Sequence, residues 1–392
     1  MTAQSISIVG AGIAGLTAAL AFAARGFDVD IVEQAEELSE LGAGLQVSPN
    51  ASRILIALGL GEALERVIIR PEQVKLVSGL SLQKIAHVPC GAFAAERWGA
   101  PYGVVHRADL QAILLQAVLD SKSCRLHLGQ RVNASGMPEP DERPDAPAPA
   151  LTIGADGVWS QSRRCIPGAN APRFSGLVAW RFMMPPDAAG ALLDRHNVTA
   201  FLGPDAHMVA YPVDGGRSIN VIAITRGTDP GRTWAQRETP TERLGLLDSF
   251  ADWHPDIVAV FRQAPQMTWW PLFGVPDGRW YDEAGTMLIG DAAHATTPFA
   301  AQGAGMAIED AYELAQAFAN APETGRIEAL KNYETHRRQR VGRARNRAAF
   351  NKFAYHARGP VRIARDMVLA IRSPESLARD LDWLYGYRAP GT

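Results

Sequence analysis

The chain has 392 residues, 47% of them hydrophobic and 20% charged, which is enough for one large domain or two ordinary ones. Its formal net charge of -2 excludes a strong overall attraction to nucleic acid or to an anionic membrane. The three cysteines, Cys90, Cys124 and Cys165, form no CxxC pair, so neither a disulfide framework nor a zinc site is indicated, and a cytoplasmic location fits. No apolar stretch reaches about 18 residues, so no membrane span is expected.

The N-terminal residues predict a strand, a glycine-rich turn, a helix and a second strand. The predicted elements are a strand at Ser5–Val9, a helix at Leu16–Arg25 and a strand at Asp28–Val32. Between the first strand and the helix lies GAGIAG, which has the GxGxxG spacing. This context favours dinucleotide binding, because free N–H groups at the start of a helix bind phosphates.

Each glycine of this motif has its own physical role. Gly10 permits the tight turn, Gly12 lets a pyrophosphate approach the backbone, and Gly15 lets helix and strand pack closely. Glu33 closes the second strand 18 residues after Gly15, where a carboxylate can accept hydrogen bonds from a ribose. The alternative is a strand–helix turn packed by small residues, and the motif alone does not separate FAD from NAD.

The Pro-rich segment 137–149 is expected to be an exposed or partly disordered loop.

Two later strands end in glycine and aspartate. Leu151–Val158 is predicted to be an apolar strand that ends at Asp156, and Met287–Asp291 is predicted to be another. A loop with Pro298 follows the second strand, and small residues then open a helix predicted at Met306–Asn320.

Between these motifs, the segment Asp187–Pro276 mixes short alternating strands with turn signals. His207 and Tyr211 are four residues apart in HMVAY, so they share one face if this segment is a strand. Near the C-terminus, six arginines fall between Arg337 and Arg347. We interpret this run as the solvated basic face of a long amphipathic helix, and nucleic-acid binding is the alternative.

Taken in order, GAGIAG, IGADGVWSQSRR and LIGDAAHATTPFAAQGAGMAIEDA resemble the three motifs of the single-component FAD-dependent aromatic hydroxylases. The stretches GAGLQVSPNA, HRADLQ, AWR, HMVAYPV and WPL match this family too. The members most similar in character are salicylate hydroxylase, 3-hydroxybenzoate 6-hydroxylase and 6-hydroxynicotinate 3-monooxygenase, and LDWLYGY resembles the tail of the salicylate hydroxylase-like members. The chain departs from the family between His127 and Gly154, where it is shorter and Pro-rich.

The resemblance implies an α/β fold with a Rossmann-like FAD-binding domain, an inserted β-sheet substrate domain and a C-terminal helical segment. The implied bounds are 1–170 and 277–358 for the discontinuous FAD-binding domain, 171–276 for the sheet domain and 359–392 for the helical tail. The active site is then expected where the inserted sheet meets the flavin, since pockets favour domain interfaces.

The resemblance also assigns residues to the flavin, in addition to Gly10, Gly12, Gly15 and Glu33. Asp291 would accept hydrogen bonds from the ribityl chain, and Pro298 would shape the loop beside the ring. Gly303 and Ala304 would let the ring come close to the backbone at a helix N-terminus, whose positive end stabilises the reduced flavin.

Four further residues have weaker assignments. Arg107 would reach the flavin or its phosphates, unless it is a surface residue bonded to Asp109. Asp156 would contact FAD or the nicotinamide cofactor, unless it only caps the following turn. Arg163 and Arg164 would contact cofactor phosphates.

Three residues are candidates for catalysis by this resemblance. His207 would remove the proton of a phenolic substrate, for which an imidazole suits working pH, or it is simply a half-buried sheet histidine. Tyr211 would contact the substrate, and Gln302 would hold a substrate carboxylate or hydroxyl.

The implied reaction uses FAD, with NADH or NADPH as a transient co-substrate, and O2. Reduced flavin would form a C4a-hydroperoxide that hydroxylates a small phenolic acid, such as salicylate, 3-hydroxybenzoate or the related 6-hydroxynicotinate. The alternatives are a monooxygenase of a larger aromatic, quinone or antibiotic substrate, a flavin reductase or oxidase without oxygen insertion, and a non-catalytic redox sensor. No metal and no nucleic-acid partner is expected, and the protein is expected to be a monomer or a homodimer.

Overall fold

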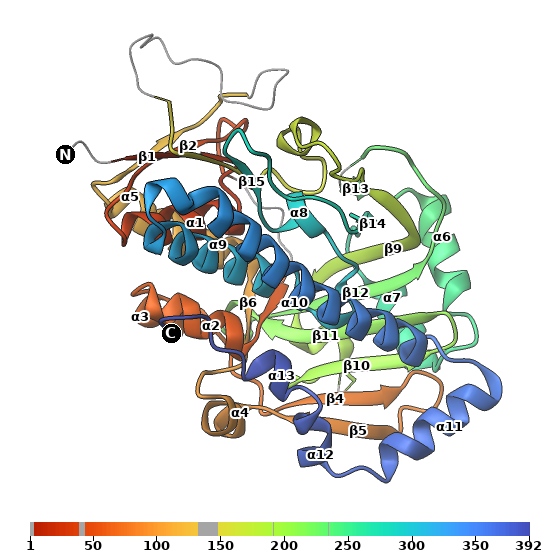
Figure 1. Ribbon diagram of the computed structural model, residues 1–392. Helices are drawn as coiled ribbons and strands as arrows, with labels where there is room; N and C mark the ends of the chain where they lie inside the picture. Colours follow the sequence, from red (N-terminus) through yellow and green to blue (C-terminus); the bar gives the residue numbers. More distant parts are fainter. Residues whose placement is uncertain (1–3, 39–43, 132–147, 191, 234) are drawn as a thin grey trace.

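The computed structural model describes residues 4–38, 44–131, 148–190, 192–233 and 235–392. In these residues the fold has two large β-sheets, one of five strands and one of eight (Figure 1). The expected α/β class, with a Rossmann-like core, a second sheet and C-terminal helices, is confirmed. The Pro-rich segment 137–149 lies outside the described residues except for its last two positions.

The five-stranded sheet is parallel throughout, in the order β15-β8-β1-β2-β7. Its strands are β1 (Ser5–Val9), β2 (Asp28–Val32), β7 (Cys124–His127), β8 (Leu151–Gly154) and β15 (Thr286–Leu288). The chain leaves β1 at the glycine motif, and it reaches Asp156 just after β8 and Asp291 just after β15. Because these three strands are neighbours and run in one direction, the three sequence motifs lie at the same edge of the sheet. In open α/β sheets this carboxyl edge is where ligands bind.

The helices α1 (Ile13–Ala23) and α9 (Gly303–Asn320) pack against each other, and α5 (Arg107–Asp120) packs against α1 (Figure 1). Both α1 and α9 begin three residues before their predicted starts. In α1, Gly15 lies inside the first helical turn, where a Cβ would be 1.9 Å from the carbonyl oxygen of Gly10. Gly15 and Gly303 therefore lie in the first helical turns, whereas Gly10 and Gly12 precede α1.

The eight-stranded sheet has the order β13-β14-β9-β12-β11-β10-β4-β5. Its strands are β4 (Gln73–Ser78), β5 (Lys84–Pro89), β9 (Arg173–Met184), β10 (Val198–Gly203), β11 (Ala206–Val213), β12 (Ser218–Arg226), β13 (Gln236–Arg237) and β14 (Thr268–Gly274). One face buries Phe182, Met208 and Val221 in a core shared with α6 (Pro240–Ser249) and α7 (Pro255–Gln263). The opposite face lines a cavity between this sheet and the glycine turn after β1.

This sheet is larger than the expected substrate domain, 171–276. Strand β4 pairs with β10 in parallel, from Val74 opposite Val198 to Ser78 opposite Leu202, and β5 extends the sheet beyond β4. Residues before 171 therefore complete the sheet. Strands β4 and β5 lie more than a hundred residues before β10 and carry no motif.

Helix α10 (Arg326–Tyr355) runs across both sheets, and three short helices then return over β4 and β5 (Figure 1). These three are α11 (Gly359–Ala370), α12 (Pro374–Arg379) and α13 (Asp382–Tyr385). The remaining α-helices are α2 (Pro49–Ala57), α3 (Gly61–Glu65), α4 (Gly91–Trp98) and α8 (Asp291–His294), and strands β3 (Gly44–Val47) and β6 (Gly103–His106) form a two-stranded sheet. Among the described helices, none combines the length and apolarity that crossing a membrane requires.

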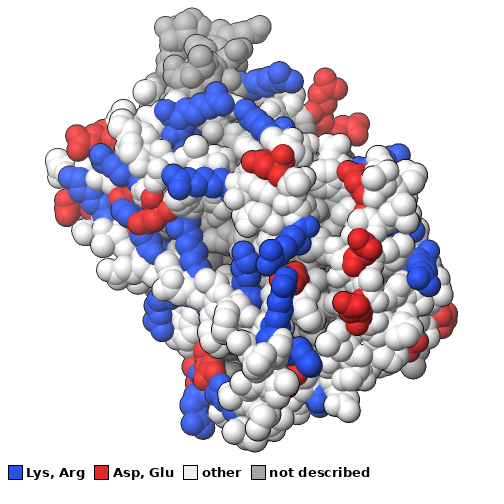
Figure 2. Space-filling model, turned by 90° about the vertical axis from the view of Figure 1, so that its right-hand side faces the viewer, with Lys and Arg blue, Asp and Glu red and all other residues white. Residues whose placement is uncertain are grey.

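Helix α10 is long, as expected, but its arginine run forms a solvated basic face only in part. Arg337 is 0% exposed and bonds to Asp310 at 2.8 Å, Glu309 at 2.7 Å and Glu313 at 2.9 Å. Arg340 is also buried and pairs with Glu309 at 2.5 Å. These carboxylates all belong to α9, so two of the six arginines join helices inside the protein. On the face in Figure 2, the exposed basic side chains are interspersed with acidic ones.

Candidate active site

The three glycines of the N-terminal motif lie in three different environments. Gly10 has a φ of +103°, and a Cβ there would be 2.6 Å from the carbonyl oxygen of Ala155. Gly15 packs against the turn itself, whereas a Cβ on Gly12 would meet nothing within 4 Å. Gly12 therefore presents bare backbone to open space, as a close-approaching pyrophosphate requires.

That open space is a groove formed by two adjoining cavities. One has a volume of about 270 Å³ and runs along Glu33, Asp156 and the glycine turn. The other has about 320 Å³ and lies between this turn and the open face of the eight-stranded sheet. Gly12, Ala155 and Gly157 line both cavities. The groove thus leads from the dinucleotide motif to the second sheet, which suits a long ligand.

The two acidic residues of the smaller cavity are partly engaged by the backbone. Glu33 accepts hydrogen bonds from the N–H groups of Ala11 at 2.9 Å and Ala35 at 3.0 Å. Asp156 Oδ2 accepts from the N–H groups of Gln161 at 2.7 Å and Ser162 at 3.1 Å, which is the capping role considered as the alternative. Asp156 Oδ1 is buried and has no hydrogen-bond partner among the described residues. One oxygen of Asp156 thus holds the turn, and the other is left for a donor in the groove.

Arg163 does not reach the groove as a phosphate ligand. Its guanidinium is buried and donates to backbone carbonyls, to Ala292 at 2.7 Å, Val158 at 2.8 Å and Asp291 at 3.0 Å. Burial lowers its pKa, and the nearby carboxylates Asp156 and Asp291 oppose this effect. Arg163 therefore ties the loop after β8 to the loop after β15. Arg164 is exposed and lines neither cavity.

The larger cavity collects most of the residues assigned to the flavin ring. Asp291, Pro298, Gly303 and Ala304 line it, together with Arg107 at the start of α5. Helix α9 begins at this cavity, and its N-cap residue makes no side-chain cap. The first N–H groups of α9 are thus available to a ligand in the cavity, and the helix dipole favours negative charge there.

His207 lies on the opposite wall of this cavity, in β11, and is 3% exposed. The rings of Phe299 and Tyr355 pack against it, with centroids 5.0 Å and 5.4 Å away. Burial, with a smaller contribution from His356, lowers the pKa of His207 well below its ordinary value. The imidazole is therefore neutral at physiological pH, so one ring nitrogen carries a lone pair, although burial disfavours the protonated form.

Tyr211 and Arg181 lie on the same face of the sheet as His207, and all three line the cavity. The ring of Tyr211 lies against Gly44, where a Cβ would be 2.5 Å from it, and burial raises its pKa. Arg181 is in β9, with its guanidinium over the Trp270 ring at 5.1 Å. The cavity wall thus offers a neutral base, a phenol and a fixed positive charge.

Gln302 does not join this lining. Its side chain donates to Ser48 Oγ at 3.0 Å and accepts from Asn50 Nδ2 at 3.3 Å, and it is 4% exposed. The amide is thus used to hold the loop before α9 against α2. The substrate contact expected for it has no counterpart in this arrangement.

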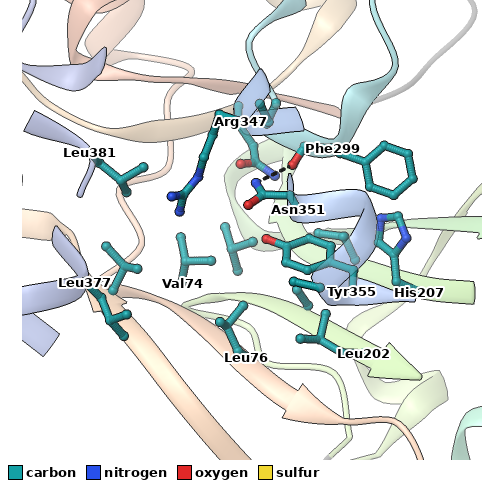
Figure 3. Close-up of a pocket in the computed structure, with 18 of the residues that line it drawn as sticks. Val74, Leu76, Leu202, His207, Phe299, Arg347, Asn351, Tyr355, Leu377 and Leu381 are labelled. Atoms are coloured by element: carbon teal, nitrogen blue, oxygen red, sulfur yellow. Dashed lines mark hydrogen bonds between the residues drawn. The ribbon is translucent and has the colours of Figure 1, made fainter. Parts of the chain in front are cut away.

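A third pocket, of about 160 Å³, continues past His207 under the C-terminal helices (Figure 3). It shares Gln46, His207, Val209, Pro298 and Ala301 with the larger cavity. Its walls are mainly aliphatic residues of β4 and β10 and of the helices that cover them, among them Val74, Leu76, Leu202, Leu377 and Leu381. The guanidinium of Arg347 projects into it from α10 (Figure 3).

Residues 3–348 match the protein family described as FAD binding domain. The chain belongs to this family. The flavoprotein is 32% identical to 3-hydroxybenzoate 6-hydroxylase 1 of Aquipseudomonas alcaligenes over 98% of each chain. It is 35% identical to 3-amino-4-hydroxybenzoate 2-monooxygenase of Streptomyces cremeus over 98% of this chain and 95% of the relative. It also resembles the crystal structure of a variant of Klebsiella pneumoniae HpxO complexed with FAD, with a TM-score of 0.82, 25% identity and coverage of 97% and 98%.

These similarities confirm the expected family and make the flavoprotein an FAD-dependent aromatic monooxygenase. The described residues fit the cofactor. The Oδ1 of Asp156, which has no hydrogen-bond partner among the described residues, lies at the smaller cavity, the bare backbone of Gly12 lines both cavities, and the small residues at the start of α9 line the larger one.

Two site residues escaped the sequence reasoning. The sequence does contain a signal for Arg181, because it is the one charged residue in the apolar strand FSGLVAWRFMM between Phe174 and Met184. His356 had none, because it is 149 residues from His207, which it contacts at 2.8 Å.

Proposed function

We propose that the protein hydroxylates a small phenolic acid, with NADH or NADPH as electron donor and O2 as oxygen donor. The substrate class is that of salicylate or 3-hydroxybenzoate. The observation that carries the proposal is the placement of His207, a neutral base on the cavity wall opposite the assigned flavin residues. A reductase or oxidase without oxygen insertion does not need a base at that wall.

The assigned roles follow from the environment of each side chain. When bound, FAD supplies the redox chemistry that activates O2. His207 accepts the proton of the substrate hydroxyl, which raises the electron density of the ring carbon to be attacked. Arg181 pairs with the substrate carboxylate, and Tyr211 contacts the substrate beside it. The enclosing rings of Phe299 and Tyr355 exclude water from the base.

The test is oxidation of NADH and of NADPH by the FAD-loaded protein across a panel of hydroxybenzoates and hydroxypyridines, with hydrogen peroxide quantified in parallel. We expect one compound to accelerate oxidation with little peroxide, because its bound form consumes the activated oxygen. If every electron ends in peroxide for all compounds, the proposed substrate class is wrong.

A larger substrate is the second candidate, and the pocket beyond His207 favours it. A ring held at His207 has about 160 Å³ of mainly apolar space beside it, with Arg347 in its wall. Arg347 makes no ion pair or hydrogen bond within the described residues, so it can pair with an anionic group at the end of an apolar arm. Selective turnover of a hydroxyaryl acid with such an arm, and loss of that selectivity in Arg347→Met, would support this candidate.

A further inference from the structure

The ring of His207 is hydrogen-bonded to a second histidine from the far end of the chain. His207 Nδ1 lies 2.8 Å from Nε2 of His356, and the ring centroids are 5.1 Å apart. His356 is the C-cap of α10, just before the chain turns into α11. His207 is 3% exposed, whereas His356 is only half-buried. The pair thus connects the buried cavity wall with a more open part of the protein.

The C-terminal junction is fixed to the sheet at this point. The carbonyl oxygen of His356 accepts from the N–H of Asp205, in the turn between β10 and β11, at 3.3 Å. Asp205 also pairs with Arg358, two residues after His356, and with Arg226 of β12 at 3.0 Å. The contact between the histidines is therefore held by backbone and ion pairs on both sides.

A bond between two neutral imidazoles contains one proton, which makes one ring nitrogen the donor and the other the acceptor. If His207 donates from Nδ1, its Nε2 carries a lone pair. No described protein group hydrogen-bonds to that Nε2. The tautomer that lets His207 act as a base is thus the one in which His356 accepts.

Burial creates a difficulty for a base that works alone. A positive charge on His207 would be enclosed by Phe299 and Tyr355, and desolvation opposes it. His356 faces Lys352 of its own helix and Arg226 of β12, and Asp205 and Arg358 lie at the same junction. Burial, with the charges of Lys352 and Arg226, lowers the pKa of His356 to about 4. Neither ring keeps a second proton, so a proton accepted at one end must leave at the other.

We propose that His356 is a positioning residue that also carries the substrate proton from His207 to solvent. This inference rests on the proposed function, in which His207 deprotonates a phenol. The substrate O–H bond breaks and its electron pair stays on oxygen, while an N–H bond forms at His207 Nε2. The proton on His207 Nδ1 passes to His356 Nε2, and His356 Nδ1 releases its own proton to water. One proton leaves, nothing is oxidised, and the reverse transfer returns the proton to the oxygen of the product.

The test is proton release on substrate binding, measured with the FAD-loaded, oxidised protein and no reductant. A phenolic substrate from the panel is mixed with the protein in weak buffer, and an indicator dye and the phenolate absorbance are followed by stopped flow. We expect His356→Ala to slow proton release by about 10²-fold, the lower end of the ~10²–10⁴-fold range of acid–base groups. His336→Ala, which removes an exposed histidine bonded to Tyr387, is the matched control and should behave as wild type.

His356→Gln separates carrying the proton from holding the ring. A glutamine oxygen can accept from His207 Nδ1 but cannot pass a proton on, so release should stay slow, and free imidazole should accelerate it in His356→Ala. Full recovery in His356→Gln would overturn the relay, as would wild-type release in His356→Ala. Failure of the proposed function looks different, because then the wild-type protein itself releases no proton with any phenol.

Discussion

Replacing Arg337 by methionine tests whether the buried charge network holds the flavin loops together. The guanidinium is 0% exposed and bonds to three carboxylates of α9. One of them, Asp310, also accepts from the N–H of Gly290 at 2.9 Å and contacts His294 Nε2 at 2.5 Å. The network therefore connects α10, through α9, to α8 and its N-cap Gly290, beside Asp291.

The expected loss of stability is worked from the partners that remain. Removing one partner of a buried ion pair costs about 3–5 kcal/mol. In Arg337→Met, Glu309 keeps Arg340 and Asp310 keeps His294. Among the described residues, Glu313 keeps only the hydroxyl of Tyr387 at 2.9 Å and His336 at 3.6 Å. Burial already raises the pKa of Glu313, so this carboxylate can take up a proton and limit the penalty. We therefore expect the lower end of the range, about 3 kcal/mol.

The assay is urea unfolding of the FAD-loaded protein, followed by circular dichroism and by flavin fluorescence. The control is Arg338→Met, the same change one residue later, where the partner Asp277 has a side chain that is 59% exposed. We expect that control to lose no more than about 1 kcal/mol, as surface pairs do. If both variants unfold at the same urea concentration, the network does not stabilise the fold as reasoned.

Three further outcomes follow from individual positions. Gly10→Ala should cost more than about 1 kcal/mol in urea unfolding, because it strains a left-handed backbone against Ala155, whereas Gly12→Ala should fold normally and bind FAD more weakly in titrations. The folded pKa of Asp310, about 2 against 3.8 in the unfolded chain, means that its stabilisation is complete above pH 4 and fades toward pH 2. Burial would raise this pKa, but the charges of His294 and Arg337 outweigh it, so acid unfolding of Asp310→Asn should show a shallower decline. Because His207 stays neutral well below pH 6.5, the rate of hydroxylation should not fall between pH 8 and pH 6.5, and a decline centred near pH 6.5 would contradict its assignment.

The dinucleotide half of the fold was readable from sequence because each of its motifs follows a strand of one parallel sheet. Gly10 comes directly after β1, Asp156 two residues after β8 and Asp291 three residues after β15. The order of the strands alone therefore brings these residues together. The shared face of His207 and Tyr211 followed from the period of a strand in the same way. These relations are local, or they depend on which strands are neighbours.

Contacts between segments that are distant in the chain could not be predicted from the sequence. Arg337 is buried because α9 presents three carboxylates to it, and the charge pattern of α10 alone looks like a solvated face. Arg163 donates its hydrogen bonds to backbone carbonyls, and Gln302 bonds with Ser48 and Asn50. The residue types and sequence positions of both had suggested ligand binding. His356 reaches His207 only through the turn that ends α10.

The most direct test of the central claim is the mass of the product formed under 18O2 by the wild-type protein and by His207→Gln. The substrate is the panel compound with the lowest peroxide yield, and His336→Gln, the same change at an exposed histidine, serves as the control. We expect the wild-type product to carry one 18O atom, and we expect His207→Gln to oxidise NAD(P)H while diverting most electrons to peroxide. A His207→Gln enzyme that forms labelled product at the wild-type rate would contradict the assignment of His207 as the base. A wild-type product without 18O would contradict oxygen insertion itself.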